Sequence, residues 1–300
     1  MSKRSRAALL LAFAAGCWSI AGVLTRQLDS ASGFEITFWR SFFCAVTMLL
    51  ILGWQQRGNP LAPLRAAGWA GLASGLMWGV MFTCFMLALT RTSVANTLLV
   101  MSIGPLLAAL LGRAVLGTRL STATWGAIVL AGLGIGWMVH EGVSADGLAG
   151  MSIALAVPVA SAINIVMLKR LHASVDLGPA VLTGALLSCL ITLPFAWPFT
   201  AGAHDLAILA LLGAWQLAIP CVLMIRAVRH LASHEVALIA LLEVVLGPIW
   251  AWLGADEAIP AATIQGGLIV LGALVGNELL AARSERGPAA QPLPPPTGPA

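Results

Sequence analysis

The stretch ALIALLEVVLGPIWAW, from Ala237 to Trp252, decides which fold this sequence can adopt. It is an apolar run with one carboxylate, Glu243, near its middle, and the pair Gly247 and Pro248 follows closely. A charge inside an apolar span is costly, and such residues usually face a cavity or a partner. Proline removes a backbone donor and loosens the helix beside that charge. The pair therefore predicts a hinge next to a polar site.

A second, quieter version of this stretch lies about half a chain earlier. Leu98 to Leu111, LLVMSIGPLLAALL, carries the same pair as Gly104 and Pro105, but its polar group within the span is Ser102. We expect this pair to be a hinge as well. Two copies of one arrangement predict an internal repeat.

The composition excludes a soluble globular protein. Of the 300 residues, 59% are hydrophobic and only 9% are charged, against roughly 45–50% and about 25% in soluble domains. A membrane-spanning helix needs about 20 mostly apolar residues, and ten segments meet this requirement without the alternation of barrel strands. We therefore expect an all-α integral membrane protein with ten transmembrane helices. The expected spans are Ala7–Thr25, Phe34–Gly53, Ala66–Leu89, Val94–Leu111, Thr122–Val139, Leu148–Leu168, Gly178–Phe199, Leu206–Ala227, Val236–Gly254 and Ala261–Ala281.

Lysine and arginine placement predicts the orientation, because cytoplasmic loops carry an excess of both. With a cytoplasmic N-terminus, the opposite side carries only Arg26 and Arg91, and Arg40 lies inside a span. Both termini are then cytoplasmic. The other basic residues fall on the cytoplasmic side: Lys3, Arg4, Arg6, Arg57, Arg65, Arg113, Arg119, Lys169, Arg170, Arg226, Arg229, Arg283 and Arg286.

The two halves of the chain correspond to each other in sequence. WGAIVLAG at 125–132 matches QGGLIVLG at 265–272, and TRQL at 25–28 ends the first span as LKRL at 168–171 ends the sixth. Five spans are an odd number, so the second copy enters the membrane inverted. Such inverted repeats are typical of secondary transporters, with the pathway at the repeat interface. We expect repeats at 1–143 and 144–283 and a disordered cytoplasmic tail at 284–300.

Three sequence motifs resemble the EamA-type permeases of the drug/metabolite transporter superfamily. They are WRSF at 39–42, ALTRTSVAN at 88–96 and LLEVVLGPIW at 241–250, and the resemblance covers about 7–281. It implies a permease that exports amino acids or other small metabolites. One departure follows the ninth span, where LGADE at 253–257 replaces the family's Leu-Gly-Glu. Its first-half counterpart, LGTR at 116–119, lacks the acid.

Glu243 is the strongest candidate for a substrate-binding residue. It could bind a substrate amine, a proton or both, or it could be a structural partner of Arg40 or of free carbonyls near Pro248. Arg40 lies about 9 Å into its span at 1.5 Å per residue. It could reach the outer surface, pair with Glu243 or bind a substrate carboxylate.

Other polar or aromatic residues within the spans are further candidates. Asn164 and Gln216 are costly in lipid and are expected to line water or meet another helix, whereas Ser102 could bond its own backbone. Trp18 and Trp78 lie away from the interfacial belt and could form the walls of a binding site or pack in the core. Glycines at every fourth residue predict close helix contacts in three spans. They are Gly71, Gly75, Gly79, Gly132, Gly136, Gly272 and Gly276.

These features predict a multi-pass protein of the bacterial inner membrane that exports small metabolites, most plausibly amino acids, by alternating access. The alternatives are a flippase for a lipid or lipid-linked solute, and a membrane component that acts only within a complex. Partners are a small-molecule substrate and the lipid bilayer, with protons as a candidate coupling ion and a monomer or homodimer as the assembly. No nucleotide-binding loop, metal-ligand spacing, nucleophile–base pair or clustered basic patch is present in the sequence, so we expect no cofactor, no metal, no enzyme activity and no nucleic acid.

Overall fold

In the computed structural model, residues 2–55, 62–140, 144–171 and 177–285 are described, and every regular element among them is a helix. Ten helical segments are long and apolar enough to cross a membrane, which confirms the predicted fold class. They start and end within a few residues of the expected spans. The predicted tail at 284–300 begins slightly too early, because α14 continues to Glu285. The rest of that tail and the loops at 57–60 and 141–143 lie outside the described residues.

Several spans are made of more than one helical element. The first span consists of α1 and α2, and the fourth of α6 and α7. The eighth span consists of α11, η1 and α12 and ends with the short helix η2. A short helix, α4, precedes the third span. The bounds are α1 Lys3–Ser19, α2 Ala21–Thr25, α3 Gly33–Gln55, α4 Ala62–Ala66, α5 Gly68–Leu89, α6 Val94–Ser102, α7 Gly104–Leu116, α8 Thr122–His140, α9 Ala145–Arg170, α10 Leu177–Ala196, α11 Ala203–Leu211, η1 Leu212–Ala218, α12 Ile219–Ala227, η2 Val228–His230, α13 Ser233–Ala255 and α14 Ala261–Glu285.

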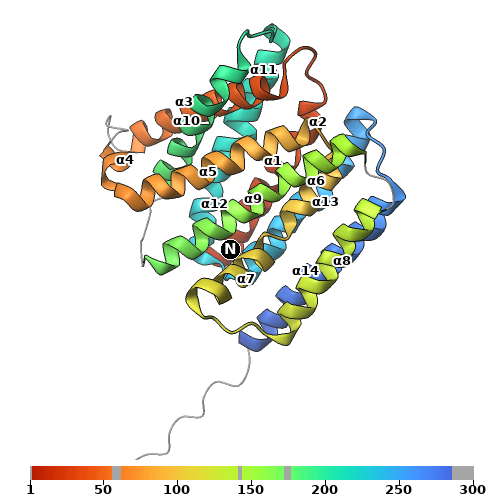
Figure 1. Ribbon diagram of the computed structural model, residues 1–300. Coiled ribbons are helices and arrows are strands. Elements are labelled where there is room, and N and C mark those ends of the chain that lie inside the picture. The colour runs from red at the N-terminus through yellow and green to blue at the C-terminus, as the bar shows by residue number, and fades with distance from the viewer. Residues whose placement is uncertain (1, 56–61, 141–143, 172–176, 286–300) are drawn as a thin grey trace, which may run out of the picture.

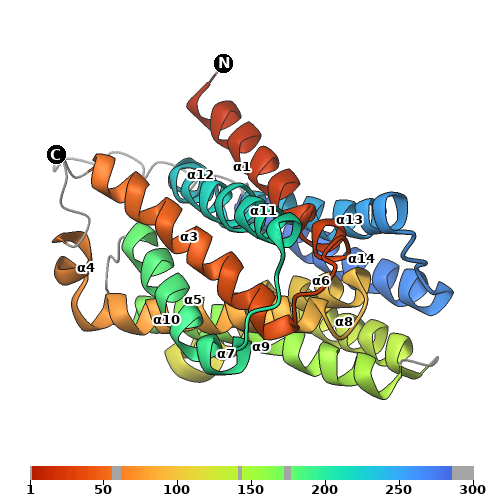
Figure 2. The same cartoon turned by 90° about the horizontal axis from the view of Figure 1, so that it is seen from above.

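The packing of the spans follows the internal repeat. The pairs α3/α10 and α8/α14, each made of corresponding spans from the two halves, pack against each other. The third span packs on the sixth (α5/α9), and the eighth packs on the first (α12/α1), so each contact is repeated with the halves exchanged. In Figure 1, α8 and α14 form a pair beside the remaining bundle, and Figure 2 shows the same helices from above. This reciprocal pattern agrees with two inverted five-helix repeats.

The two Gly-Pro pairs have different local structures. The helix of the fourth span breaks at Ile103, and α7 starts at Gly104 with Pro105 in its first turn. The N–H that proline lacks would have no hydrogen-bond partner within the helix at this position, so no helix hydrogen bond is lost. In the ninth span, α13 runs unbroken from Ser233 to Ala255 with Pro248 inside it. The hinge role of both pairs stays a prediction. The seventh span ends at Ala196, before the expected Phe199, because Pro198 has no N–H with which to continue the helix.

Close helix contacts occur at glycines, but only partly at those expected. A Cβ at Gly75 would lie 2.6 Å from Cβ of Thr183, and one at Gly79 would lie 3.2 Å from the Gly184 carbonyl oxygen, so α5 and α10 meet at this stripe. The expectation for the fifth and tenth spans was wrong. The contact between α8 and α14 is made at Gly134, where a Cβ would lie 2.7 Å from the carbonyl oxygen of Gly266. The expected glycines there have open space around them: Gly132, Gly136, Gly272 and Gly276.

Candidate functional site

A cavity of about 170 Å³ lies between the two repeats, and five of the predicted binding residues line it. They come from α1, α3, α5, η1 and α13, so both halves of the chain contribute. The apolar wall includes Met81, Phe82, Phe85, Met101, Val157 and Leu217. The five predicted residues are Trp18, Arg40, Trp78, Gln216 and Glu243.

Arg40 is held by a neighbouring amide and keeps part of its guanidinium uncommitted. Its side chain is only 2% exposed, so it does not extend to the outer surface. Nε and Nη2 donate to Oε1 of Gln216 at 3.2 and 3.0 Å, and Cζ lies 5.4 Å from the ring centre of Phe85. Nη1 is buried and has no hydrogen-bond partner among the described residues. A buried donor of this kind is costly and is available to an acceptor that enters the cavity.

Gln216 is positioned by a departure from α-helical geometry. It lies in η1, a π-helical segment of seven residues within the eighth span. Pro220 has no N–H to donate to the Gln216 carbonyl oxygen four residues earlier. The regular series of α-helical hydrogen bonds is therefore interrupted at this segment. Such π-helical segments are frequent at functional sites. The Gln216 amide also donates from Nε2 to the carbonyl oxygen of Trp18 at 3.1 Å, which fixes the amide between the first span and Arg40.

Glu243 faces Arg40 across the cavity without forming an ion pair with it. No N–O pair within 4.0 Å joins the two in the described structure, and the interaction between them is electrostatic at longer range. Glu243 also lines a second cavity of about 150 Å³ between α13 and the α6–α7 segment. The structure therefore shows no ion pair between Glu243 and Arg40. A structural pairing of these two residues was one of the roles that the sequence left open.

The remaining predicted residues are placed less centrally. Ser102 lines the second cavity, but its hydroxyl donates to the Leu99 carbonyl oxygen of its own helix at 2.7 Å. Trp78 has a buried indole N–H with no partner among the described residues. Asn164 is buried on α9 and lines neither cavity. The substrate-binding role of each residue stays a prediction.

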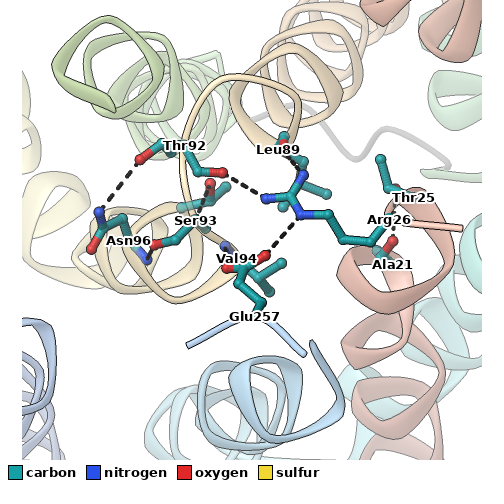
Figure 3. A network of polar contacts seen from close by, with 10 residues as sticks. Ala21, Thr25, Arg26, Leu89, Thr92, Ser93, Val94, Asn96 and Glu257 are labelled. Carbon is teal, nitrogen blue, oxygen red and sulfur yellow. Dashed lines mark hydrogen bonds and ion pairs between the residues drawn. The ribbon is translucent and has the colours of Figure 1, made fainter. Parts of the chain in front are cut away.

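A second group of polar residues, which sequence reasoning did not single out, lies at the end of the bundle that is expected to be external. Arg26, after α2, donates from Nε to Oε2 of Glu257 at 2.8 Å, and from its other nitrogens to the carbonyl oxygens of Leu89 and Thr92 (Figure 3). Oε1 of Glu257 accepts the backbone N–H of Val94 at 2.7 Å. One arginine and one glutamate thus connect four segments. The sequence signal that could have indicated this pair is that both residues are charges, which are rare in this chain, placed directly after the first and ninth spans.

Two buried carboxylates at the same end also join the halves of the chain. Glu35, 1% exposed, accepts from the backbone N–H groups of Thr200 and Ala201, each at 2.9 Å, and from the Thr200 hydroxyl at 2.8 Å. Asp205, also 1% exposed, accepts from the backbone N–H groups of Asp29 and Ser30. Each carboxylate satisfies donors of the loop that precedes the other's helix, so α3 and α11 are tied together. The sequence analysis singled out neither acid.

The fold and the cavity define a polytopic helical membrane protein with a central cavity between two five-helix repeats. The chain matches the model of the EamA-like transporter family at residues 5–139 and again at 148–277, and it belongs to that family. This is a family of transporters, in agreement with the expectation that the chain is not an enzyme.

Similar proteins were found at low sequence identity. The chain is 24% identical over 280 residues to the pseudopaline exporter CntI of Pseudomonas aeruginosa strain PAO1, covering 89% of this chain and 94% of the relative. The protein of the same name from strain UCBPP-PA14 matches equally. A solved crystal structure, described without a function, superposes with a TM-score of 0.67 at 20% identity over 94% of this chain and 100% of its own. That likeness supports the fold alone.

Proposed function

We propose that this protein exports small zwitterionic metabolites, amino acids among them, across the bacterial inner membrane by alternating access. Glu243 would take the cationic group of the cargo and Arg40 its carboxylate. The observation that carries the proposal is one apolar-walled cavity that holds both charges without an ion pair between them. A buried charge needs a partner or neutralisation, and a zwitterion supplies a partner to each.

The size of the cavity favours a small solute. A volume of about 170 Å³ is below the roughly 300–1,000 Å³ of pockets that hold drug-sized ligands. This argues against the alternative of a flippase for a lipid or lipid-linked solute. The export direction is supported by the relative that is named as an exporter.

Protons are the proposed coupling ion, because a carboxylate that lines an apolar cavity and has no ion-pair partner within reach can take a proton. In this scheme the cargo and a proton use Glu243 in turn. Monomer and homodimer both stay open as the assembly.

The test is transport by purified protein in liposomes, against a panel of amino acids, with and without a pH gradient. Glu243→Gln keeps the shape of the side chain and removes its charge. Because a hydrogen bond to a charged group contributes about 1.5–3 kcal/mol, we expect the rate per folded molecule to fall about tenfold or more, with loss of pH dependence. Asp146→Asn, which neutralises an exposed carboxylate, is the matched control and should behave as wild type. A Glu243→Gln protein with wild-type rate and unchanged pH dependence would refute the role of Glu243.

A further inference from the structure

The two ends of the bundle differ in how tightly the cavity-lining helices are packed. In α6, every residue except Met101 is buried, whereas α7, which continues the same span, buries only Leu106 and Gly112. In α13, the buried residues are Val244, Gly247, Pro248 and Ala251, all after Glu243, and the ten residues before Glu243 include none. The fourth and ninth spans are therefore closely packed toward the Arg26 end and loosely packed toward the opposite end.

The cavities show the same asymmetry. The central cavity and the cavity between α13 and α6–α7 share Met101 and Glu243. The second of these extends to Ala237, one turn from the first residue of α13. At the other end, a pocket of about 540 Å³ is lined by Arg26 and neighbouring loop residues together with residues of helix ends such as Asn96, and it shares no lining residue with the central cavity. The cavity system leads away from the Arg26 end.

The Arg26–Glu257 pair lies at the edge of the outer pocket, which Arg26 lines. Its two side chains are 28% and 16% exposed and are joined at 2.8 Å. Asp256 ends α13 in a left-handed conformation, at φ 50°, a position that aspartate tolerates better than most residues. This turn is followed directly by Glu257, which bonds both Arg26 and the first N–H of α6. The pair thus ties the end of α13 to the start of α6 and to the ends of α2 and α5 (Figure 3).

Among the described residues, no equivalent pair is found at the opposite end, and the internal repeat offers a reason. The sequence correspondence places Lys169 where Arg26 stands in the first half, and Arg119 in the loop that corresponds to the acidic loop at 255–257. Both side chains are exposed, and two cations repel where the other end has an arginine and a glutamate. The Arg4–Glu235 pair at that end joins α1 to α13, which already pack together, and does not cross to α7.

We propose that the Arg26–Glu257 pair is the latch of the outer gate, and that the structure describes the state whose cavity is open toward the opposite, cytoplasmic end. Closing that end brings Arg119 toward Lys169 and must be accompanied by separation of Arg26 from Glu257. The charge pattern of the two loops therefore biases the resting transporter toward the inward-open state. This inference rests on the proposed alternating access but does not depend on the identity of the cargo or on the role of Glu243.

The test measures access to the cavity from each side of the membrane. A cysteine at Met101, in a chain without the five native cysteines, is labelled with a membrane-impermeant thiol reagent in vesicles of both orientations. Ala145→Cys, beside the outer pocket, identifies the side that the Arg26 end faces. Met101→Cys should be labelled from the opposite side and slowly from the Ala145 side.

Glu257→Gln removes the charge of the latch. Because a ligand-free two-state equilibrium shifts about tenfold for each 1.4 kcal/mol, loss of this ion pair should raise labelling from the Ala145 side by about fivefold or more and lower it from the other. Arg4→Gln removes the ion pair at the opposite end and is the matched control, with no rise expected from the Ala145 side. Should Glu257→Gln fail to fold, Arg26→Lys is the second test, because it keeps the charge but loses the planar guanidinium whose three nitrogens bond three separate acceptors, and a smaller rise is expected.

Unchanged labelling in folded Glu257→Gln or Arg26→Lys protein would overturn the latch, as would an equal rise in Arg4→Gln. Labelling does not require transport. Wild-type transport in Glu243→Gln would therefore refute the proposed cargo site but not the latch. Unchanged labelling in Glu257→Gln together with lost transport in Glu243→Gln would refute only the latch.

Discussion

The contact between α5 and α10 allows a quantitative test of the packing that shapes the cavity. A Cβ at Gly184 would lie 2.5 Å from Cβ of Trp78, 2.9 Å from the Gly79 nitrogen and 3.0 Å from the Trp78 carbonyl carbon. Non-bonded carbon atoms are optimally about 3.5–4.0 Å apart, so Gly184→Ala must push two helices apart by about 1 Å. None of the three atoms belongs to the flexible end of a side chain, and Trp78 lines the cavity.

The expected loss of stability in Gly184→Ala can be estimated by comparison with a glycine where an added Cβ would contact no other atom. Overpacking costs typically about 1–3 kcal/mol, whereas replacing glycine by alanine in a helix gains about 1 kcal/mol in propensity at any interior position. Gly132→Ala, where an added Cβ has no atom within 4 Å, receives the gain alone. The two variants should therefore differ in unfolding free energy by about 1–3 kcal/mol, with Gly184→Ala the less stable.

The assay is thermal unfolding of both variants and wild type in the same detergent, with transport in liposomes measured in parallel. Gly184→Ala should melt below wild type and Gly132→Ala at or above it. Displacement of Trp78 should also slow transport in Gly184→Ala. Equal melting temperatures for the two variants would refute the argument that the α5–α10 contact has no space for an added methyl group.

Three further predictions concern topology, the buried acids and the arginine site. Ala145→Cys in a cysteine-free chain should react with an impermeant reagent added outside the cell, and labelling only from the cytoplasm would contradict the inverted repeat. Glu35→Ala leaves the donors at 200–201 without their acceptor, so unfolding in denaturant should show a loss of about 3 kcal/mol or more; wild-type stability would show that water replaces the carboxylate. Gln216→Glu keeps the acceptor oxygen of Arg40 and neutralises the guanidinium charge, although it gives up the Nε2 donor to the Trp18 carbonyl oxygen. KM of the folded protein for a carboxylate-bearing cargo should rise, and an unchanged KM would argue against Arg40 as the carboxylate site.

The sequence predicted the fold closely because each span is a nearly unbroken apolar run. Length and hydropathy fix such helices largely without reference to their neighbours. The ninth span, expected at Val236–Gly254, runs from Ser233 to Ala255. The inverted arrangement followed from the odd number of spans in each half.

The candidate site was predictable residue by residue but not in its contacts. Polar groups within apolar spans pointed to Arg40, Gln216 and Glu243, and all three line one cavity. Nothing in the sequence indicates that Gln216, rather than Glu243, receives the Arg40 guanidinium, because the π-helical segment that orients it depends on local backbone geometry. The Arg26–Glu257 pair was missed for a similar reason, since it joins loops 231 positions apart.

The π-helical segment in the eighth span also bears on how this chain should be aligned with others. A seven-residue segment with wider turns absorbs one residue more than an α-helix of the same rise. Each residue of an α-helix corresponds to about 100° of rotation. Deleting one residue within Leu212–Ala218 would let a regular α-helix cover the same rise, so α12 would keep its orientation and Cys221 its place at the cavity. A relative with a regular eighth helix should therefore align with a one-residue gap in this segment, and an alignment without that gap would compare residues on different faces from Ile219 onward.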